Sequence, residues 1–301
     1  MDHYLISGGS GFIGKSLCHL LLQQGHHVSI LSTQPNYQAF HPNIQVIGWD
    51  TQNKSIHENL ADQSYHVINL AGAGVADKRW TAERKREILQ SRQDALDTLF
   101  LAQQQGKLHM THLTSASAIG FYGLQTGLCD ELTAGDDSFL SEVCQQWEQS
   151  ALRFQSLNIP VAIVRVGIVL GKDGGAFKEF IKPLKFGIAG IPGHGKQLYS
   201  WIHIHDITAL FYFVSQHQLH GVYNGVAPRP VSLNRLFDEI VKHKKGVFAK
   251  IHAPAWIINM ALGGMSIEIL KSTEVSSNKI QQTGFQFKFK EIQEAIGDLI
   301  L

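Results

Sequence analysis

The sequence predicts an α/β protein in which a doubly wound parallel sheet is joined to a smaller, mainly helical C-terminal lobe. Two observations carry this prediction. Short apolar runs alternate with longer amphipathic segments through the first 171 residues, and each apolar run is continuous rather than alternating. Continuous apolar strands are typical of parallel sheets, which are covered by helices on both faces. Because crossovers between parallel strands are almost always right-handed, a doubly wound sheet is the expected arrangement.

Six apolar runs are expected to form the strands of this sheet. In chain order they are His3–Ser7, Val28–Leu31, Ile44–Trp49, His66–Leu70, His109–Thr114 and Val161–Val166. The segments expected to be helices lie between them, at Phe12–Gln24, Thr81–Gln105 and Phe139–Leu157. In the second helical segment, apolar residues such as Ile88, Ala95 and Leu99 recur at helical spacing.

The pattern loosens after residue 171. A strand-like run at Trp201–Ile204 leads into a helix from Asp206, a further strand-like run covers Val222–Val226, and most of the tail looks helical. We therefore expect a main domain over residues 1–171, to which residues 200–227 return. Residues 172–199 and 228–301 are expected to form the smaller lobe.

The amino-acid composition argues against several classes of function. The 26 Lys and Arg residues balance 25 Asp and Glu residues, so the net charge of +1 lacks the basic excess of nucleic-acid-binding proteins. Cys18, Cys129 and Cys144 form no C-x-x-C pair, which favours reduced thiols in a reducing compartment. A strand-like run starts at residue 3, and no apolar stretch approaches the ~18 residues of a membrane span. A cytoplasmic protein with neither a membrane nor a nucleic-acid partner is expected.

A glycine-rich turn connects the first strand to the first helix. The segment Ile6–Gly14 reads ISGGSGFIG, and Gly8, Gly11 and Gly14 form a G-x-x-G-x-x-G pattern. Gly8 would allow the tight turn, Gly11 would let the backbone approach a diphosphate, and Gly14 would let helix and strand pack closely. The helix start adds unpaired N–H groups and a partial positive charge. The pattern predicts a dinucleotide cofactor held by Gly8, Ser10, Gly11, Phe12, Ile13 and Gly14.

The end of the second strand favours NADP over NAD as that dinucleotide. A carboxylate there usually bonds the ribose hydroxyls of NAD and would repel a 2′-phosphate. The chain instead has Ser32 and Thr33, which can donate hydrogen bonds, and Lys15 could supply positive charge. No Arg lies in this loop, so the NADP pattern is incomplete. Asp50, after the third strand, could contact the adenine or could be a turn residue.

These residues resemble the short-chain dehydrogenase/reductase superfamily, specifically its extended, epimerase-like branch. Four later segments also look like motifs of that branch: Asn69–Gly72, Thr114–Gly123, Arg165–Gly171 and Trp201–Asp206. A narrower, atypical "epimerase family protein" group is matched by Asn69–Trp80, Ser91–Arg92, Ser117–Gly123, Phe139–Glu148, Gly171–Ala176, Pro254–Leu270 and Gly284–Phe285. The resemblance covers nearly the whole chain. The glycine pattern is widely shared, whereas the ADKRW segment and the C-terminal pattern are more specific.

The resemblance implies a Rossmann fold and further cofactor contacts. Leu70, Ala71 and Gly72 would lie against the cofactor, and the nicotinamide would lie near Ser115, Ser117 and Arg165–Ile168. Extended relatives often form homodimers through the helices near 81–105 and 139–157, and the charged residues 83–87 leave a homodimer open here. Asp206 would open a helix as its N-cap, for which Asp is favoured. Arg165 ends a buried strand and needs a partner, either a phosphate or a buried carboxylate.

The catalytic Tyr-x-x-x-Lys pair of active superfamily members is missing. Its lysine lowers the pKa of the tyrosine, which then exchanges a proton while the nicotinamide exchanges a hydride. None of the seven tyrosines is followed by Lys four residues later. On the expected helix, the two registers place either Val143 and Trp147 or Cys144 and Glu148 at the positions of the pair. Neither combination can perform the usual proton transfer.

Several residues are candidates to replace the pair or to bind substrate. Ser117 and Tyr122 flank the end of a central strand, and Tyr122 could donate a proton if a nearby cation lowered its pKa; it could equally be a packed aromatic. Glu142 and Glu148 could act as acid or base if buried, although exposed helix carboxylates are the default. Cys144 is expected to be a core residue.

Substrate recognition is expected from Lys78, Arg79 and Trp80, which follow the fourth strand on a loop, and from Trp201. Two cations beside an indole suit an anionic or planar ligand, while a solvated turn with a Trp anchor is the alternative. No metal site is expected, because His203 and His205 lack an evident third ligand.

Two functional hypotheses follow. The first is an NADP-binding, epimerase-like oxidoreductase that acts on a small polar substrate, such as a sugar nucleotide, between the sheet and the lobe. The alternative is a non-catalytic sensor or scaffold that reports the NADPH level to a partner protein. The missing Tyr-x-x-x-Lys pair is the reason for this alternative.

Overall fold

A sheet of eight strands forms the centre of the molecule. The computed structural model describes residues 1–34, 37–244 and 246–300. The strand order is β13-β8-β6-β5-β1-β2-β3-β4, and every neighbouring pair except β3 and β4 is parallel. The strands are β1 (His3–Ser7), β2 (His27–Ser32), β3 (Ile44–Asp50), β4 (Ser55–Ile56), β5 (Leu60–Asn69), β6 (Leu108–Ala118), β8 (Val161–Val166) and β13 (Gly221–Gly225). The chain order reverses between β1 and β5, so the predicted doubly wound sheet is confirmed.

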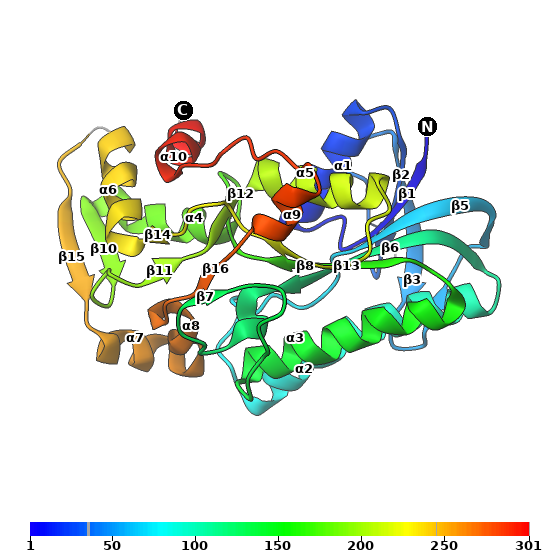
Figure 1. Cartoon of the computed structure of the whole chain (residues 1–301), viewed down its shortest axis with the longest axis horizontal. Helices are drawn as coiled ribbons and strands as arrows, with labels where there is room; N and C mark the ends of the chain where they lie inside the picture. The colour runs from blue at the N-terminus through cyan, green and yellow to red at the C-terminus, as the bar shows by residue number, and fades with distance from the viewer. Residues whose placement is uncertain (35–36, 245, 301) are drawn as a thin grey trace.

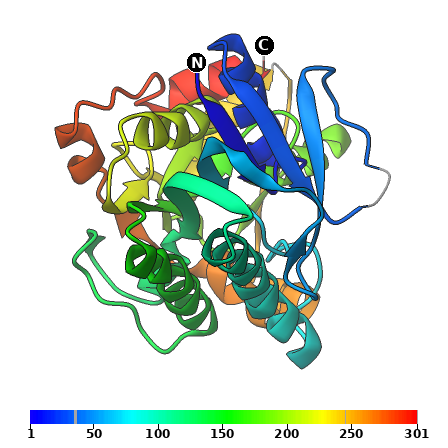
Figure 2. The same ribbon diagram turned by 90° about the vertical axis from the view of Figure 1, so that its right-hand side faces the viewer.

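Helices cover both faces of the sheet, as Figures 1 and 2 show. On one face α1 (Phe12–Gln23) packs beside α5 (Ile204–Gln216). On the other face α2 (Ala82–Gln104) runs alongside α3 (Phe139–Leu152). Their apolar sides and both sheet faces form the first hydrophobic core, which also takes in Phe285 and Phe287 from the tail.

Several predicted boundaries move, and the strand expected from His66 begins at Leu60. Two of the other shifts have identifiable reasons. The strand expected to end at Thr114 continues to Ala118, because the polar Ser115 and Ser117 are buried and hydrogen-bonded by Asn69 and Glu148. The helix expected to reach Leu157 ends at Leu152, and a 3-10 turn (Arg153–Leu157) follows it.

The start of α5 corrects the expected role of Asp206. The helix begins at Ile204, and its N-cap is His203, whose Nδ1 accepts from the amide of His205 at 3.1 Å. The Asp206 carboxylate instead accepts from the amides of Lys288 and Phe289, each at 2.9 Å. Asp206 therefore attaches the C-terminal segment to the start of α5 and is not the N-cap.

The smaller lobe has its own hydrophobic core, which gathers side chains from residues 170–201, 227–240 and 289–299. Its helices are α4 (Gly175–Ile181), α6 (Leu233–Lys244), α7 (Ala255–Leu262), α8 (Ser266–Leu270) and α10 (Ile292–Ile300). Its strand pairs are β10 (Ile188–Pro192) with β15 (Ala249–Ala253) and β11 (Leu198–Tyr199) with β14 (Val231–Ser232). Figure 1 shows these strands and α6 at the end of the molecule opposite β3. Residues 245 and 301 of the predicted lobe lie outside the described residues.

Short strand pairs join the two parts. The segment β9 (Ile168–Leu170) continues from β8 and pairs with β12 (Trp201–His203), while β7 (Leu128–Cys129) pairs with β16 (Glu274–Val275). Of the two strands expected in 200–227, only β13 joins the main sheet, beside β8. A short helix, α9 (Asn278–Gln282), packs near β13. Within the described residues, no helix has both the length and the apolar character needed to cross a membrane.

Acid should destabilise the protein through a buried histidine in the sheet. His112 is fully buried on β6, and its Nε2 donates to the Leu219 carbonyl at 2.7 Å. Burial lowers the pKa of His112 from 6.5 to about 4, so between these values the unfolded chain binds a proton that the folded protein does not. This stability is present above pH 6.5, is lost as the pH falls toward 4, and amounts to about 3 kcal/mol.

The measurement is urea unfolding of wild type and two variants between pH 7 and pH 4. His112→Gln should show a shallower loss of stability with acid than wild type. His109→Gln, at an exposed position on the same strand, should follow wild type. An unchanged slope for His112→Gln would contradict the assignment.

Candidate functional site

The glycine-rich turn has no room for a Cβ at Gly8, Gly9 or Gly14; on Gly9 it would lie 2.4 Å from Ile30 Cγ2. Gly8 has a φ of 72°, and a Cβ on it would lie 2.8 Å from the carbonyl carbon and oxygen of Leu70. A Cβ on Gly14 would lie 2.2 Å from the Gly8 carbonyl oxygen and 2.7 Å from Gly9 Cα. These approaches match the roles expected for Gly8 in the tight turn and for Gly14 in the packing of α1 on β1.

Gly11 stands in a different environment. It is the N-cap of α1 with φ −76° and ψ 177°, and no side chain caps the helix. A Cβ there would meet only the Gly8 carbonyl oxygen, at 3.2 Å. The first turn of α1 carries no acidic residue, and the amides of Phe12, Ile13 and Gly14 have no intrahelical partner. Exposed Ser10 and these amides therefore present donors and partial positive charge at one open surface.

A chain of buried hydrogen bonds holds the strand ends beside this turn. Ser7 Oγ donates to Asn69 Oδ1 at 2.6 Å, and Asn69 Nδ2 donates to Ser115 Oγ at 3.2 Å. The bonds link the carboxyl ends of β1, β5 and β6, where the strand order reverses. Leu70 and Ala71 come next after β5 and lie against Gly8, while Gly72 lies against the side chain of Arg92. The structure thus brings the segment 70–72 beside the glycine-rich turn.

The end of β2 carries the residues expected to select the dinucleotide. Ser32 Oγ accepts from the amide of Gln34 at 3.1 Å, and Thr33 is exposed. The two residues that follow Gln34 lie outside the described residues. Lys15, together with Ser10, Gly11 and Phe12, lines a cavity of about 630 Å³ at the start of α1.

Asp50 is a turn residue, the second of the two roles left open for it. Its carboxylate accepts from the amides of Gln52 and Asn53 at 2.9 and 3.0 Å and from Asn53 Nδ2 at 2.7 Å. These bonds hold the pKa of Asp50 below its usual range. Its carboxylate closes the turn between β3 and β4.

A second cavity, of about 550 Å³, lies between the carboxyl edge of the sheet and the smaller lobe. From the sheet side it is lined by residues directly after β5, β6 and β8, including Val75, Ile119 and Gly167. From the lobe side it is lined by Leu198, Tyr199 and residues of α7 and α8. The wall is mainly apolar, in contrast to the small polar substrate expected from the sequence.

Three of the four positions considered for the missing catalytic pair line this cavity, and Glu148 does not. Val143, Cys144 and Trp147 of α3 all line it. Burial raises the pKa of the Cys144 thiol to about 11, so the thiol keeps its proton at neutral pH. The cavity wall therefore carries two apolar side chains and a neutral thiol where active relatives would place tyrosine and lysine.

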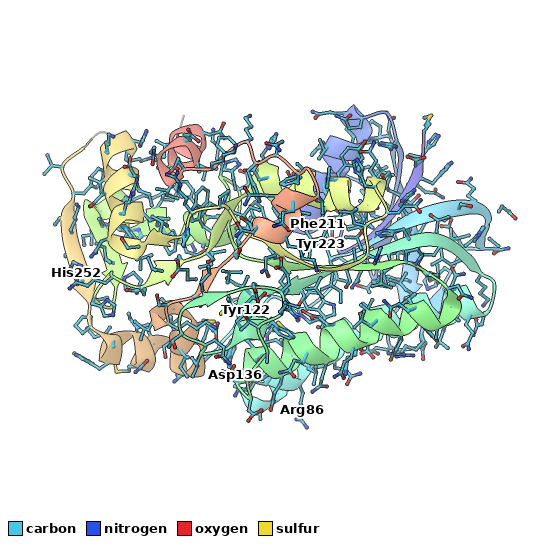
Figure 3. All side chains as sticks on the ribbon, viewed as in Figure 1. Arg86, Tyr122, Asp136, Phe211, Tyr223 and His252 are labelled. Atoms are coloured by element: carbon cyan, nitrogen blue, oxygen red, sulfur yellow. The ribbon has the colours of Figure 1, made fainter. Side chains whose placement is uncertain are left out.

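Ser117 and Tyr122 belong to a buried network and do not line either cavity. Glu148 is bound through both carboxylate oxygens by Arg165, from Nε and Nη2 at 2.9 Å each, and also accepts from Ser117 Oγ at 2.7 Å. Arg165 Nη1 donates to the Tyr122 hydroxyl at 3.1 Å, and that hydroxyl donates to Asn224 Oδ1 at 2.6 Å. Tyr122 is fully buried, and its label lies near the middle of the view in Figure 3.

This network bears on three residues singled out in the sequence. Burial raises the pKa of Tyr122 to about 12 despite the neighbouring Arg165, so the condition set for Tyr122 as a proton donor, a lowered pKa, is not met. Its fully buried ring fits the packed-aromatic alternative. Glu148 is buried, whereas an exposed carboxylate was the default expectation; Glu142 is exposed. Of the two partners left open for Arg165, the structure shows the carboxylate, and its contacts do not support the cofactor role expected for Arg165.

The residues expected to bind substrate do not lie together in the structure. Trp80 lines the cavity between sheet and lobe, and its Nε1 donates to the Val75 carbonyl at 2.8 Å. Lys78 and Arg79 are exposed and do not line it; Arg79 instead lies beside Gly263 of the lobe. Trp201 is fully buried in the core of the lobe, where its Nε1 donates to the Arg229 carbonyl, so its expected substrate contact is wrong.

One lining residue was missed. Arg92 is only 8% exposed, yet it lines the same cavity. The sequence offered only its membership of the Ser91–Arg92 match, because an arginine inside a polar helix segment is ordinarily solvated.

A parallel sheet with its strand order reversed beside a glycine-rich turn defines a nucleotide-binding protein of the Rossmann class. The sequence pattern of the NAD dependent epimerase/dehydratase family matches residues 4–225, and a domain of unknown function, DUF1731, matches residues 253–299. The chain belongs to the NAD dependent epimerase/dehydratase family, which confirms the resemblance stated above.

Relatives match the full length of the chain. An epimerase family protein of Staphylococcus saprophyticus is 37% identical over 303 residues, covering all of both chains. One from Staphylococcus aureus is 34% identical and covers all of this chain and 99% of its own. Among solved structures, a human epimerase family protein crystallised with NADPH is 27% identical, with a TM-score of 0.88 and 99% of each chain covered. A UDP-glucose 4-epimerase from Thermus thermophilus, at 17% identity and a TM-score of 0.80, shares the fold.

Proposed function

We propose that the protein is an NADP-dependent oxidoreductase that transfers a hydride to or from a small molecule bound between the sheet and the lobe. One observation carries the proposal: the open amides at the start of α1 stand at the reversal point of the sheet, and a cavity of about 550 Å³ opens after the neighbouring strands. The amides of Phe12, Ile13 and Gly14 would bind the diphosphate, with Ser10 beside them. The bound cofactor supplies the hydride.

The residues at the end of β2 support a preference for NADPH over NADH. Ser32 and Thr33 offer donors where a carboxylate would select NAD, Lys15 is nearby on α1, and the similar human protein was crystallised with NADPH. We expect calorimetric titration to show NADPH binding at least several-fold more tightly than NADH. Tighter binding of NADH would overturn the preference and leave the site itself intact.

The chain's own groups limit how a proton can reach the substrate. The cavity wall holds the neutral Cys144 thiol, the Tyr199 hydroxyl, which donates to the Ile269 carbonyl, and Lys271, which is paired with Glu268. Burial raises the pKa of Tyr199, so neither hydroxyl nor thiol is a base at neutral pH.

A test is NADPH oxidation against a panel of apolar and polar carbonyl compounds, with cofactor binding confirmed in the same sample. Turnover of any member above the background without enzyme supports the oxidoreductase. The alternative, a sensor that binds NADPH without turnover, is favoured by the burial of Ser117 and Tyr122 away from the cavity. Tight NADPH binding without turnover, together with NADPH-dependent capture of a partner, would support that alternative.

A further inference from the structure

Three arginine side chains of the described residues are buried, and they differ in their partners. Arg165 is bound by both carboxylate oxygens of Glu148. Arg84 donates to the Gly74 carbonyl and pairs with Glu87 at 2.7 Å and with Asp77 at 3.5 Å. Arg92 is as buried as these two, but no carboxylate of the described residues lies within ion-pair distance of it.

The guanidinium of Arg92 is only partly satisfied. Nη1 donates to the carbonyls of Ala73 and Ile88, at 3.0 and 2.6 Å. Nε is buried with no hydrogen-bond partner, and Nη2 makes no hydrogen bond to the described residues. The group lies over the ring of Trp147, 4.7 Å from its centroid. Burying a cation costs free energy unless an anion lies beside it. The guanidinium of Arg92 therefore lacks an anionic partner.

The position of Arg92 indicates where that partner comes from. Among the three buried arginines, only Arg92 lines the cavity between sheet and lobe. Gly72 leaves room for it, since a Cβ there would lie 2.9 Å from Arg92 Cγ. The acidic groups on the cavity wall already have cations: Glu179 pairs with Lys182 and Glu268 with Lys271. No acidic side chain of the wall therefore competes for the guanidinium.

The other side chains of the cavity wall indicate the polarity of the rest of the ligand. Around Arg92 the cavity presents mainly apolar side chains: Trp80, Ile119, Leu140, Val143, Trp147 and Met265. Such a surface gains free energy from burying apolar groups and offers few partners to a sugar. Lys271 on the same wall is already paired with Glu268, so Arg92 is the cation of this wall that has no carboxylate partner among the described residues. Such a cation in an apolar enclosure suits one anionic group on an apolar body.

We infer that Arg92 anchors the substrate by an anionic oxygen group, a carboxylate or a phosphate, and that the remainder of the substrate is apolar. This inference rests on the proposed function, because it assigns the substrate class of the same cavity. The anion would accept from Nη2 and complete the coordination of the guanidinium in the way that Glu148 completes that of Arg165.

The test compares charged and neutral ligands that share a phenyl body. The probes are 3-phenylpropanoate, its neutral amide 3-phenylpropanamide, and phenyl phosphate, titrated by calorimetry with and without NADPH. Wild type should bind at least one of the two anions roughly tenfold or more tightly than the amide, as expected for a charge-assisted hydrogen bond in a buried site. Whether the carboxylate or the phosphate binds better identifies the natural group.

Three variants make the test specific. Arg92→Met should abolish the preference for the anion over the amide, and Arg92→Lys should restore part of it. Arg86→Met removes an exposed arginine from the same helix, labelled in Figure 3, and should keep the wild-type preference. The readout is the ratio of the affinities for anion and amide, measured on the same variant. A modest loss of stability affects both affinities and therefore does not by itself abolish the preference.

Three outcomes would overturn the inference: equal binding of anion and amide by wild type, no binding of either anion, or a wild-type preference in Arg92→Met. NADPH titration of the same samples separates this failure from failure of the proposed function. If NADPH binds and the preference for the anion over the amide is absent, only the assignment of the substrate class is contradicted. If the preference is present and NADPH does not bind, the cofactor assignment falls instead.

Discussion

Replacement of Gly11 by valine should weaken NADPH binding strongly and leave the fold intact. Valine readily adopts the Gly11 backbone angles of −76° and 177°, and its Cβ would meet only the Gly8 carbonyl oxygen. Its methyl groups would instead fill the open surface in front of the first amides of α1. Loss of two charge-assisted hydrogen bonds of about 1.5 kcal/mol each lowers affinity by roughly 100-fold. Calorimetric titration with NADPH measures this loss, and thermal unfolding checks the fold.

Gly14→Val is the matched comparison within the same turn. Its Cβ would lie 2.2 Å from the Gly8 carbonyl oxygen, which is backbone and cannot move aside cheaply. Overpacking of this kind costs about 1–3 kcal/mol, so Gly14→Val should be clearly less stable than wild type. Wild-type affinity in a folded Gly11→Val protein would refute the proposed role of the turn.

Glu148→Gln should cause the largest loss of stability of any single change considered for the site. It leaves the Arg165 guanidinium buried without its counter-charge, and breaking a buried pair from one side typically costs about 3–5 kcal/mol. Chemical denaturation at neutral pH measures the loss. Glu142→Gln, on the exposed side of the same helix, should cost less than about 1 kcal/mol.

A double variant separates charge from packing in this network. Replacing both Glu148 and Arg165 by apolar residues of similar size should recover a large part of the stability lost by Glu148→Gln. Equal stability of Glu148→Gln and Glu142→Gln would show that the pair contributes little to folding.

The sequence predicted those features that depend on neighbouring residues. The strands His3–Ser7 and Val161–Val166 agree residue for residue, because a continuous apolar run between polar ends defines a buried parallel strand. The roles of Gly8 and Gly14 followed in the same way, since a strand, a tight turn and a helix within a few residues leave little choice of backbone.

Features that depend on distant pairing could not be predicted. Glu148 looks like an ordinary helix carboxylate until β8 places Arg165 against it. Asp206 looks like an N-cap, but its oxygens accept from amides more than 80 residues away. Trp201 occupies a family motif, yet the lobe folds over it and makes it core. In each case the tertiary partner, rather than local propensity, decides the role of the side chain.

The most direct measurement is an amide ¹H–¹⁵N correlation spectrum of the protein titrated with NADPH. The amide protons of Phe12, Ile13 and Gly14 should shift downfield as they donate to the diphosphate, whereas those of α6 (Leu233–Lys244) in the distant lobe should stay in place. Saturation with NADPH that leaves these three signals unmoved while others shift would place the dinucleotide elsewhere and contradict the account.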